Sequence, residues 1–431
     1  MLILYLIIEI ILSYYVLGGI IAVLGSVLTT KELIKAKKIF RSSLKNKYCI
    51  LLPVYHEQDI IQESINYFYS IFKDDEKVKI FIIATERENC KNSTYEMAKK
   101  QIEKMNAENI FTLLNVPKEY KNKVGQINYV VKNNFINNDE IVGIYDIDSR
   151  PDNKVLKIVD DLVAKNNSVN IFQQVSSYCN NLNNLSGINK ILSTSDALTQ
   201  TKWALGFEYQ LYLLYSKMIK GKKLRPLVYC VGHGLYVRGS FLKKINGFPE
   251  INNNDDLSFG YLSSVLGEAI LPVPSLDKCN ISFDYKETIS QYRFWSRGSN
   301  LYYRDINYYQ EAFEIKLSRK QKMIFLIQGF LRNFLWAWRG TLWAIITVIS
   351  IVLNNIPLIV FCFISLLFYT ILPQIIVCFE LKKLEKKKIS NIFLGVAFSP
   401  INFLLRGIGP TLSLFYRLFG NDREINYKAT R

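Results

Sequence analysis

Histidine is scarce in this sequence, and its cysteines are scattered. There are only two histidines, His56 and His233, which excludes a histidine-rich metal site. No two cysteines form a CxxC pair, and none has the spacing of a metal-ligand set. The seven cysteines are Cys49, Cys90, Cys179, Cys230, Cys279, Cys362 and Cys378. This odd, dispersed set predicts reduced thiols in or near hydrophobic cores and argues against a disulfide framework.

Charged residues are almost absent from a long run near the N-terminus. Residues 2–28 contain a single one, Glu9, and the run exceeds the about 20 residues that cross a bilayer. It is too long for the core of a signal peptide, has no basic segment before it and shows no small-residue cleavage site. We therefore expect it to stay in the mature protein as an anchor. The length of 431 residues also exceeds the single-core limit of about 250 to 300, which predicts a sizeable soluble domain beside the membrane part.

Positive charge is abundant but uneven. The formal net charge is +17, and two basic clusters, residues 31–47 and 381–388, each follow an apolar run. By the positive-inside rule both predict cytoplasmic flanks. A basic chain can bind nucleic acid, but anionic lipid headgroups are the nearer partner for clusters beside apolar spans, so we expect no nucleic acid. Taken alone, either cluster could also be a solubilising run of charge without a partner.

Further apolar runs lie in the C-terminal part. Residues 334–353 form a second predicted span, in which Arg339 is expected to snorkel or to face protein, and residues 356–379 form a third. The last apolar stretch, residues 392–420, contains two prolines, three glycines besides its terminal one and Arg406, so it is expected to be re-entrant or interfacial. The predicted organisation is an anchor (1–30), a basic cytoplasmic linker (31–46), a catalytic domain (47–320) with an interfacial segment at about 285–325, two spans (334–380) and a basic loop, short segment and tail (381–431).

Short apolar runs alternate with amphipathic stretches between residues 47 and 320. The expected strands are residues 48–55, 78–85, 109–116, 140–148 and 170–175, and the expected helices are residues 60–72, 94–105, 125–135 and 192–221. Residues 227–248 read as a strand, a turn and the start of a helix. Near-continuous hydrophobic strands separated by helices predict an α/β fold with a mostly parallel sheet covered on both faces. Ligands of such sheets bind at the carboxyl ends of the strands.

Two carboxylates follow the fourth predicted strand, in the stretch "YDIDSRPD". Asp146 and Asp148 are two residues apart, so on an extended strand end they would point to the same side. Left unpaired they would repel each other, and a hard cation such as Mg²⁺ or Mn²⁺ would resolve that conflict. A helix N-cap or a solvated turn is the simpler alternative for a D-x-D pattern.

Five segments in order resemble the family 2 glycosyltransferases of GT-A fold, in particular the membrane-integrated branch with cellulose, hyaluronan and chitin synthases and ceramide glucosyltransferases. The resemblance covers about residues 49–298 and the flanking spans. Its segments are "ILLPVYHEQDIIQESI", "NKVGQIN", "YDIDSRPD", "NNNDDLSFGYL" and "QYRFWSRG". Each match is weak alone, and their common order and spacing make the resemblance specific.

The resemblance implies a role for each matching residue. On the nucleotide side it implies Pro53, Tyr55, Glu57, Glu86 for the uracil or ribose with Glu88 in reserve, Lys123 on the phosphates, and Asp146 and Asp148 as diphosphate and metal ligands. Asp256 corresponds to the catalytic base, and Asp255 to the acid before it. The acceptor or product side would hold Asp255, Gly232, His233, Gly234, Gln291, Arg293 and Trp295.

Some of these positions depart from the family pattern. A solvated charged loop is a competing interpretation for Glu86, and a hydrogen-bonded core imidazole is one for His233. Phe294 stands where the family has an arginine before Trp295, with Arg293 and Arg297 near it, which weakens the case for a processive enzyme. Trp203, in the long predicted helix, is expected to pack and is a minor candidate for sugar contact.

The implied function is a membrane-bound inverting sugar transfer in cell-envelope glycan synthesis. A UDP-sugar is the expected donor, with a GDP-sugar as the alternative, and the acceptor is lipid-linked or a saccharide. Membrane lipids are expected partners, a homo-oligomer or other envelope-synthesis proteins are left open, and the catalytic domain is expected on the cytoplasmic side of the plasma membrane. The alternatives are a processive synthase that extrudes a β-linked polymer and a non-catalytic membrane scaffold. A transporter is disfavoured because most of the chain is a soluble α/β domain.

Overall fold

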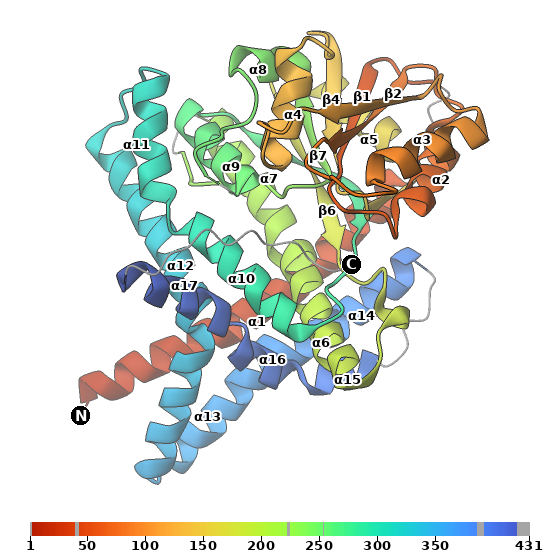
Figure 1. Ribbon diagram of the computed structural model, residues 1–431. Helices are drawn as coiled ribbons and strands as arrows, with labels where there is room; N and C mark the ends of the chain where they lie inside the picture. The colour runs from red at the N-terminus through yellow and green to blue at the C-terminus, as the bar shows by residue number, and fades with distance from the viewer. Residues whose placement is uncertain (1, 39–42, 222–224, 253, 386–391, 420–431) are drawn as a thin grey trace.

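A computed structural model describes residues 2–38, 43–221, 225–252, 254–385 and 392–419 (Figure 1). The strands are β1 (Lys47–Pro53), β2 (Val78–Thr85), β3 (Phe111–Val116), β4 (Glu140–Ile144), β5 (Arg150–Pro151), β6 (Ile171–Ser177), β7 (Leu235–Arg238) and β8 (Ile270–Lys278). The helices that cover the sheet are α2 (Ile61–Phe72), α3 (Thr94–Met105), α4 (Lys123–Lys132), α5 (Val155–Lys165), α8 (Gly239–Lys244) and α9 (Asp255–Leu266).

The other helical segments belong to the part that lies below the sheet in Figure 1 or flanks it. They are α1 (Leu2–Ala36), η1 (Leu182–Asn184), α6 (Gly187–Trp203), η2 (Ala204–Glu208), α7 (Tyr209–Lys220), α10 (Tyr285–Ser299), α11 (Tyr302–Ala312), α12 (Arg319–Val352), α13 (Ile356–Leu366), η3 (Leu367–Ile371), α14 (Leu372–Glu385), α15 (Ile392–Ala397), α16 (Ser399–Leu405) and α17 (Ile408–Leu418). Here η1 is a 3-10 turn, whereas η2 and η3 are π-helical turns.

The eight strands form one sheet in the order β3-β2-β1-β4-β7-β6-β8-β5. Strands β1 to β4 are mutually parallel, with Leu51 of β1 opposite Ile144 of β4. Strand β7 runs antiparallel to both of its neighbours, and β6 and β8 are parallel to each other. The predicted mostly parallel α/β sheet is therefore confirmed.

Alternate residues of the central strands feed two separate cores. Ile50 and Leu52 of β1 pack on one face with α2, α3 and α5, whereas Cys49 and Leu51 pack on the other with α4, α8 and α9. Because successive side chains of a strand point to opposite faces, only a strand that is apolar at every position can serve both cores. This confirms the predicted cover of helices on both faces.

Two strand predictions are wrong in detail. Strand β4 ends at Ile144 and does not reach Asp148, because a turn closed by the Ser149 N–H on the carbonyl of Asp146 follows it. Residues 227–231 form no strand; β7 instead follows the glycine turn, where Gly234 has a φ of +62°. The sequence reading also missed β8, which pairs with β6 along its length.

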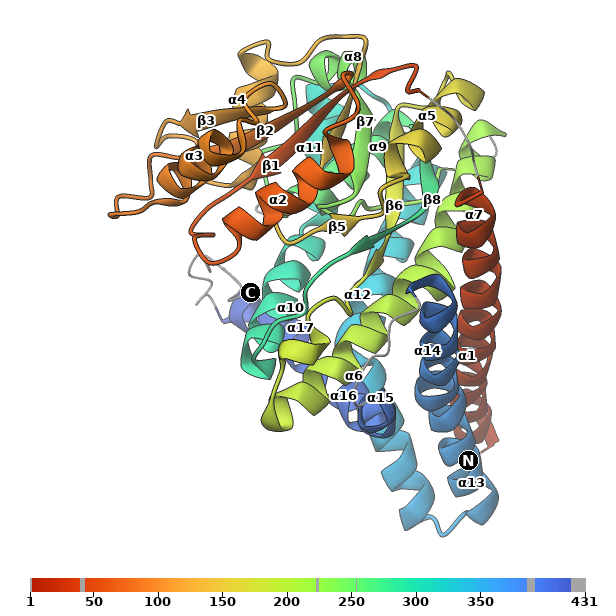
Figure 2. The same cartoon turned by 90° about the vertical axis from the view of Figure 1, so that its right-hand side faces the viewer.

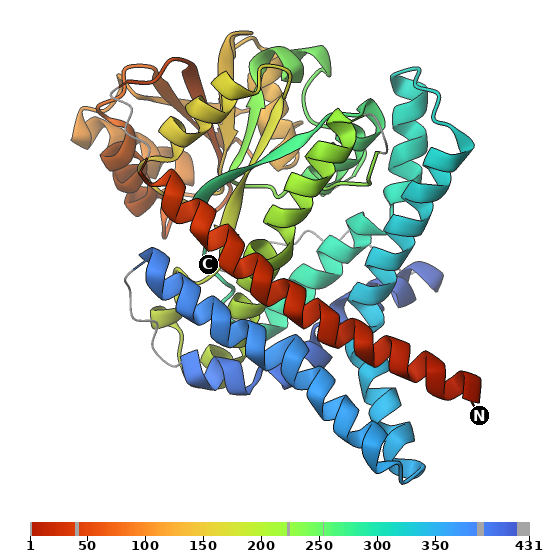
Figure 3. The same ribbon diagram turned by 180° about the vertical axis from the view of Figure 1, so that it is seen from behind.

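Three helical segments are long and apolar enough to cross a membrane: Ile3–Ala36, Arg319–Val352 and Ile356–Glu385. They extend away from the sheet in Figure 2, and in Figure 3 α1 (red) runs beside α13 and α14 (blue). The final apolar stretch forms three short helices, α15 to α17, that pack against α6, α10 and α12. Parts of the predicted basic segments, residues 39–42 and 386–391, and most of the predicted tail, residues 420–431, lie outside the described residues.

The long helix predicted at residues 192–221 is a continuous helical run from α6 through η2 to α7. It lies between the sheet and the membrane-length helices (Figure 2). A side chain on Gly25 of α1 would place its Cβ 2.0 Å from the carbonyl oxygen of Gly206 in η2. Glycine at both positions therefore lets the two backbones touch, and this contact joins α1 to the sheet domain.

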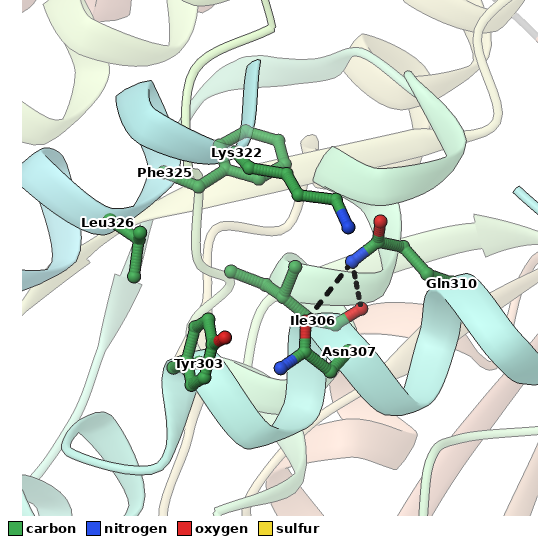
Figure 4. Close-up of a pocket in the computed structure, with 7 residues that line it drawn as sticks. All are labelled: Tyr303, Ile306, Asn307, Gln310, Lys322, Phe325 and Leu326. Carbon is green, nitrogen blue, oxygen red and sulfur yellow. Dashed lines mark hydrogen bonds between the residues drawn. The ribbon is translucent and has the colours of Figure 1, made fainter. Parts of the chain in front are cut away.

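A small pocket lies between α11 and α12, lined by Tyr303, Ile306 and Phe325 among others (Figure 4). Its polar side is closed by Gln310, whose amide donates to the Ile306 carbonyl at 3.4 Å and to Asn307 at 3.3 Å. Since its lining comes from α11 and α12 alone, it belongs to the packing of these two helices and contains none of the predicted site residues.

The contact between α1 and η2 makes a testable prediction. We expect Gly25→Ala to lower the free energy of unfolding by about 1–3 kcal/mol, because its methyl group would collide with backbone that no side-chain rotation can move. Gly18→Ala is the matched control, since its Cβ would meet the edge of the Tyr369 ring at 3.2 Å. Thermal unfolding of both variants in detergent measures the difference, and equal midpoints would contradict this account.

Candidate active site

One lysine lies at the centre of the candidate site. Lys123 is the first residue of α4, and its ammonium donates to Oδ1 of Asp146 at 2.7 Å and to the carbonyl of Gly232 at 2.5 Å. The helix begins here because the side chain of Asn122 accepts the Gly125 N–H at 2.8 Å, as an N-cap does. Segments that are distant in the sequence thus meet at the carboxyl end of β4.

Two adjacent acids stand at the N-terminus of α9. Asp255 and Asp256 are its first two residues, and Oδ1 of Asp256 accepts the Leu257 N–H at 2.8 Å. The positive end of the helix dipole favours carboxylates at these positions. A Cβ on Gly232 would lie 3.3 Å both from Lys123 Nζ and from Asp256 Oδ2, so Lys123 and Asp256 flank this glycine.

The charged groups of this cluster shift one another's pKa values. Burial and then the neighbouring Asp255 carboxylate raise the pKa of Asp256 to about 7, although Lys123 opposes them. Burial also raises the pKa of Asp255. Burial alone would lower the pKa of Lys123, but the Asp146 and Asp255 carboxylates outweigh it and raise that pKa. An acid that titrates near neutral pH is suited to accept a proton from a hydroxyl group.

The two acids of "YDIDSRPD" have different surroundings. The Asp146 side chain is 23% exposed and faces Lys123, whereas Asp148 is 2% exposed and its Oδ2 accepts the Asn280 N–H at 3.2 Å. Both lie in the turn that follows β4 and not on the strand itself. The argument from strand alternation therefore does not apply to them, because the backbone has already turned.

His233 is a buried group with fixed partners. Its Nδ1 lies 2.8 Å from Oδ2 of Asp277 and 3.3 Å from the sulfur of Cys279. Burial would lower its pKa, but the hydrogen bond and charge of Asp277 raise it. Of the two interpretations of His233, an acceptor contact and a hydrogen-bonded core imidazole, this geometry matches the core imidazole. Next to it, a Cβ on Gly234 would lie 2.8 Å from that of Gln174, so a larger residue does not fit.

The loops after β1 and β2 hold the other predicted nucleotide-side residues. Pro53 ends β1, the Tyr55 ring lies 4.8 Å from the guanidinium of Arg87, and the Glu57 N–H donates to Thr94 Oγ1 at 2.9 Å. Glu86 is exposed, and its own N–H donates to the Val116 carbonyl.

Glu88, the reserve candidate, has a structural task. It is buried, and its carboxylate accepts the backbone N–H groups of His56 at 2.5 Å and Thr94 at 2.8 Å. Glu88 therefore ties these two loops together.

The "QYRFW" segment lies on α10, against the start of α9. The Asn254 side chain donates to the carbonyls of Phe294 and Trp295 at 3.1 and 3.0 Å, so the residue before Asp255 is bound to α10. Arg293 lies 3.8 Å from the centre of the Tyr416 ring in α17. Gln291 and Trp295 belong to the same helix, α10.

Three further residues, Asn254, Asp277 and Trp203, make hydrogen bonds next to the candidate site. The sequence reading assigned no role to Asn254, because its amide binds another helix and leaves no local pattern. Asp277 was missed because β8 was missed. Trp203 donates to the Tyr229 hydroxyl at 2.7 Å, and that hydroxyl donates to Glu208 at 2.7 Å, so Trp203 packs beneath the site as expected.

Comparisons with known proteins give structural neighbours only. No family model matches the chain, and no curated protein matches it by sequence. Similar solved structures include the mannosyltransferase PcManGT from Pyrobaculum calidifontis in complex with GDP-Man and Mn²⁺, with 13% identity, a TM-score of 0.48, and 88% of this chain and 100% of that chain covered.

Two other neighbours are less similar. S. aureus TarS 1-349 has 12% identity, a TM-score of 0.42 and coverage of 86% and 92%. Glucosyl-3-phosphoglycerate synthase from Mycobacterium tuberculosis, in complex with Mn²⁺, UDP and phosphoglyceric acid, has 12% identity, a TM-score of 0.32 and coverage of 56% and 71%. Values this low assign neither a family nor an activity to the chain.

The raised pKa of Asp256 predicts a pH-dependent stability. The folded protein holds this proton more tightly than the unfolded chain, whose aspartate titrates near 3.8, so stability falls as the pH rises from about 4 to about 7. We expect Asp256→Asn to unfold at a higher temperature than the wild type, with a gap that widens between about pH 5 and about pH 8. Thermal unfolding at both pH values measures it.

The control for this prediction is Asp139→Asn, because the Asp139 side chain is 64% exposed and lies at the opposite end of β4. Its midpoint should follow that of the wild type at both pH values. An Asp256→Asn protein that is no more stable than the wild type at the higher pH would show that the Asp256 carboxylate is not strained.

Proposed function

We propose that this chain is a membrane-bound inverting glycosyltransferase that transfers a sugar from a nucleotide-sugar donor to an acceptor hydroxyl. The observation that carries the proposal is the convergence of Lys123, Asp146 and Asp256 around Gly232. A lysine can stabilise the departing diphosphate, an aspartate can bind a metal ion, and a second aspartate can act as a base in a displacement at an anomeric carbon. The resemblance to family 2 enzymes of GT-A fold assigns the same residues to these roles.

The departing nucleoside diphosphate would develop negative charge next to Lys123. The lysine ammonium is a compact point charge, and its protonated form is favoured here by the neighbouring carboxylates. It would therefore stabilise the β-phosphate as the bond to the sugar breaks.

Carboxylates, the kind of oxygen ligand that Mg²⁺ and Mn²⁺ prefer, lie at this edge of the sheet. Asp146 and Asp148 offer carboxylates, and the neighbouring Asp277 has a buried oxygen, Oδ1, without a hydrogen-bond partner among the described residues. When bound, Mg²⁺ or Mn²⁺ would neutralise charge on the diphosphate. We propose Asp146 and Asp148 as its protein ligands.

Asp256 would act as the general base. It would take the proton of the acceptor hydroxyl while that oxygen attacks the anomeric carbon from the side opposite the departing diphosphate. One base and one displacement invert the configuration, so an α-linked donor gives a β-linked product. A glycosidase would instead need two carboxyl groups that flank a glycosidic bond.

The membrane-length helices favour an acceptor at the bilayer surface, either a lipid-linked acceptor or a short saccharide, over a polymer that is extruded. Among the described residues only three segments are long and apolar enough to cross a membrane, which is few for a polymer channel in one chain. In addition, Phe294 takes the place of the arginine of processive relatives, and its carbonyl accepts the Asn254 amide. We propose a UDP-sugar as the donor and the cytoplasmic leaflet as the location.

Transfer assays test the base. With purified protein, Mn²⁺ and labelled UDP- and GDP-sugars, we expect metal-dependent release of the nucleotide, and Asp256→Asn should reduce its rate by about 10²–10⁴-fold, the range of general base catalysis. Asp139→Asn should leave the rate unchanged. A wild-type protein that binds no nucleotide sugar would instead support the non-catalytic scaffold.

The proposed metal ligands make a separate prediction. We expect Asp148→Asn to raise the Mn²⁺ concentration for half-maximal nucleotide release by about 10–100-fold, because the neutral amide oxygen binds a divalent cation more weakly than a carboxylate does. Asp256→Asn should lower the rate without changing that concentration. A titration with Mn²⁺ measures both values, and an unchanged requirement in Asp148→Asn would remove this residue from the metal site.

A further inference from the structure

Three cations gather where α6 meets the membrane-length helices. Lys202 lies at the end of α6, Arg339 within α12 and Arg406 at the end of α16. Lys202 donates to the Tyr369 carbonyl at 3.0 Å, and Arg339 donates to the hydroxyl of the same tyrosine. The charge of Arg406 also acts on Lys202. Arg339 therefore faces protein, one of the two positions predicted for it from the sequence.

The positive charge of this cluster is not balanced. Asp196 is the only described carboxylate within ion-pair distance, at 3.5 Å from Arg406 Nε, and it is buried. Asp196 also accepts the hydroxyl of Tyr292 at 2.7 Å. No carboxylate in the described part of the chain pairs with Lys202 or Arg339, so three basic side chains face one carboxylate.

Burial makes this imbalance costly. Lys202 is 5% exposed, and the Nε of Arg339 is buried without a hydrogen-bond partner among the described residues. Burial, then Arg406 and Arg339, lower the pKa of Lys202 to about 7. Aromatic rings offset part of the cost, since Arg339 lies 5.2 Å from the Tyr369 ring centre and Arg406 lies 4.8 Å from that of Tyr292. Buried charges are otherwise paired, and ionisable groups among membrane helices mark ligand sites.

We propose that Lys202, Arg339 and Arg406 bind the phosphate or diphosphate group of a membrane lipid. A phosphate dianion would supply the missing negative charge, and the two guanidinium groups present the forked donors that bind phosphate oxygens. A lipid is favoured over a free anion because α16, the helix that ends at Arg406, carries large exposed apolar side chains, Ile401 at 45% and Leu404 at 38%. Acyl or prenyl chains would cover this surface.

The cluster is connected to the candidate active site. Trp203 follows Lys202 and donates to the Tyr229 hydroxyl at 2.7 Å, and the N–H of the next residue, Cys230, donates to the Asp256 carbonyl at 3.4 Å. A lipid phosphate held by Lys202 would therefore lie on the membrane side of the candidate base. The idea that this site anchors a lipid-linked acceptor rests on the proposed function. Its affinity for lipid phosphate does not.

Lipid retention by the full-length protein tests the site without any nucleotide sugar. The protein, purified in a neutral detergent, is mixed with equal amounts of phosphatidic acid and phosphatidylcholine, and bound lipids are counted by native mass spectrometry. We expect about tenfold or greater preference for phosphatidic acid. Arg406→Gln and Arg339→Gln should abolish it, because losing one charged hydrogen-bonding group typically weakens binding about 10–100-fold. Arg406→Lys should lose less, because it keeps the charge.

Two controls separate this site from general attraction to anionic lipids. Arg319→Gln removes an exposed cation from the first residue of α12 and should leave the preference unchanged. Lys202→Met keeps the aliphatic stem and removes the charge, so it tests the site even if an arginine variant does not fold. The proposal would be overturned if Lys202→Met, Arg339→Gln and Arg406→Gln all kept the wild-type preference for phosphatidic acid, as Arg406→Lys should nearly do.

Competition with inorganic phosphate and pyrophosphate distinguishes the source of the phosphate. We expect neither to displace phosphatidic acid at equimolar concentration, because neither contacts the apolar surface; full displacement would overturn a lipid site in favour of a soluble anion. Asp256→Asn should retain phosphatidic acid like the wild type. A protein that retains it but transfers no sugar would refute the proposed function and leave this site intact.

Discussion

The candidate site depends on one ammonium group among several carboxylates. Lys123 contacts Asp146 directly, and the charges of Asp255 and Asp256 also act on it. Without this cation three acids would face one another at the end of the sheet, and their mutual repulsion would destabilise the fold. Several partly buried carboxylates around one cation are typical of functional sites, which agrees with the proposed function.

Glycine and asparagine residues give this cluster its spacing. Gly232 keeps a side chain out of the gap between Lys123 and Asp256, and Gly234 turns the chain into β7 at a positive φ. Asn254 then fixes the start of α9 to α10 through two backbone carbonyls. Backbone contacts on either side therefore hold the start of α9, where Asp255 and Asp256 lie.

Much of the fold could be predicted because the central strands β1, β2 and β4 are apolar at most positions. The runs at β1, β2 and β4 predict a sheet buried on both faces, and the structure has it. Strand β8 was missed, since prolines at two of its nine positions hide the pattern that its pairing with β6 requires. The predicted end of β4, residue 148, lies four residues beyond the observed end, because the alternation of Asp and Ile in "DID" also fits a strand. Contacts such as Asn254 with α10 and His233 with Asp277 join distant segments, and no local pattern reports them.

The two π-helical turns show how the membrane part is joined to the sheet domain. Both η2 and η3 pack on α1, where glycines allow backbone contact: Gly25 touches Gly206, and a Cβ on Gly19 would lie 2.0 Å from the Phe368 carbonyl. A π-turn widens the helix by one residue and redirects the side chains that follow it, and such turns are frequent at functional sites. Here η2 carries Glu208, which binds Tyr229 beneath the acids, and η3 carries Tyr369, which binds Lys202 and Arg339. The same helix α1 therefore packs against both the element below the candidate active site and the element that holds the cation cluster.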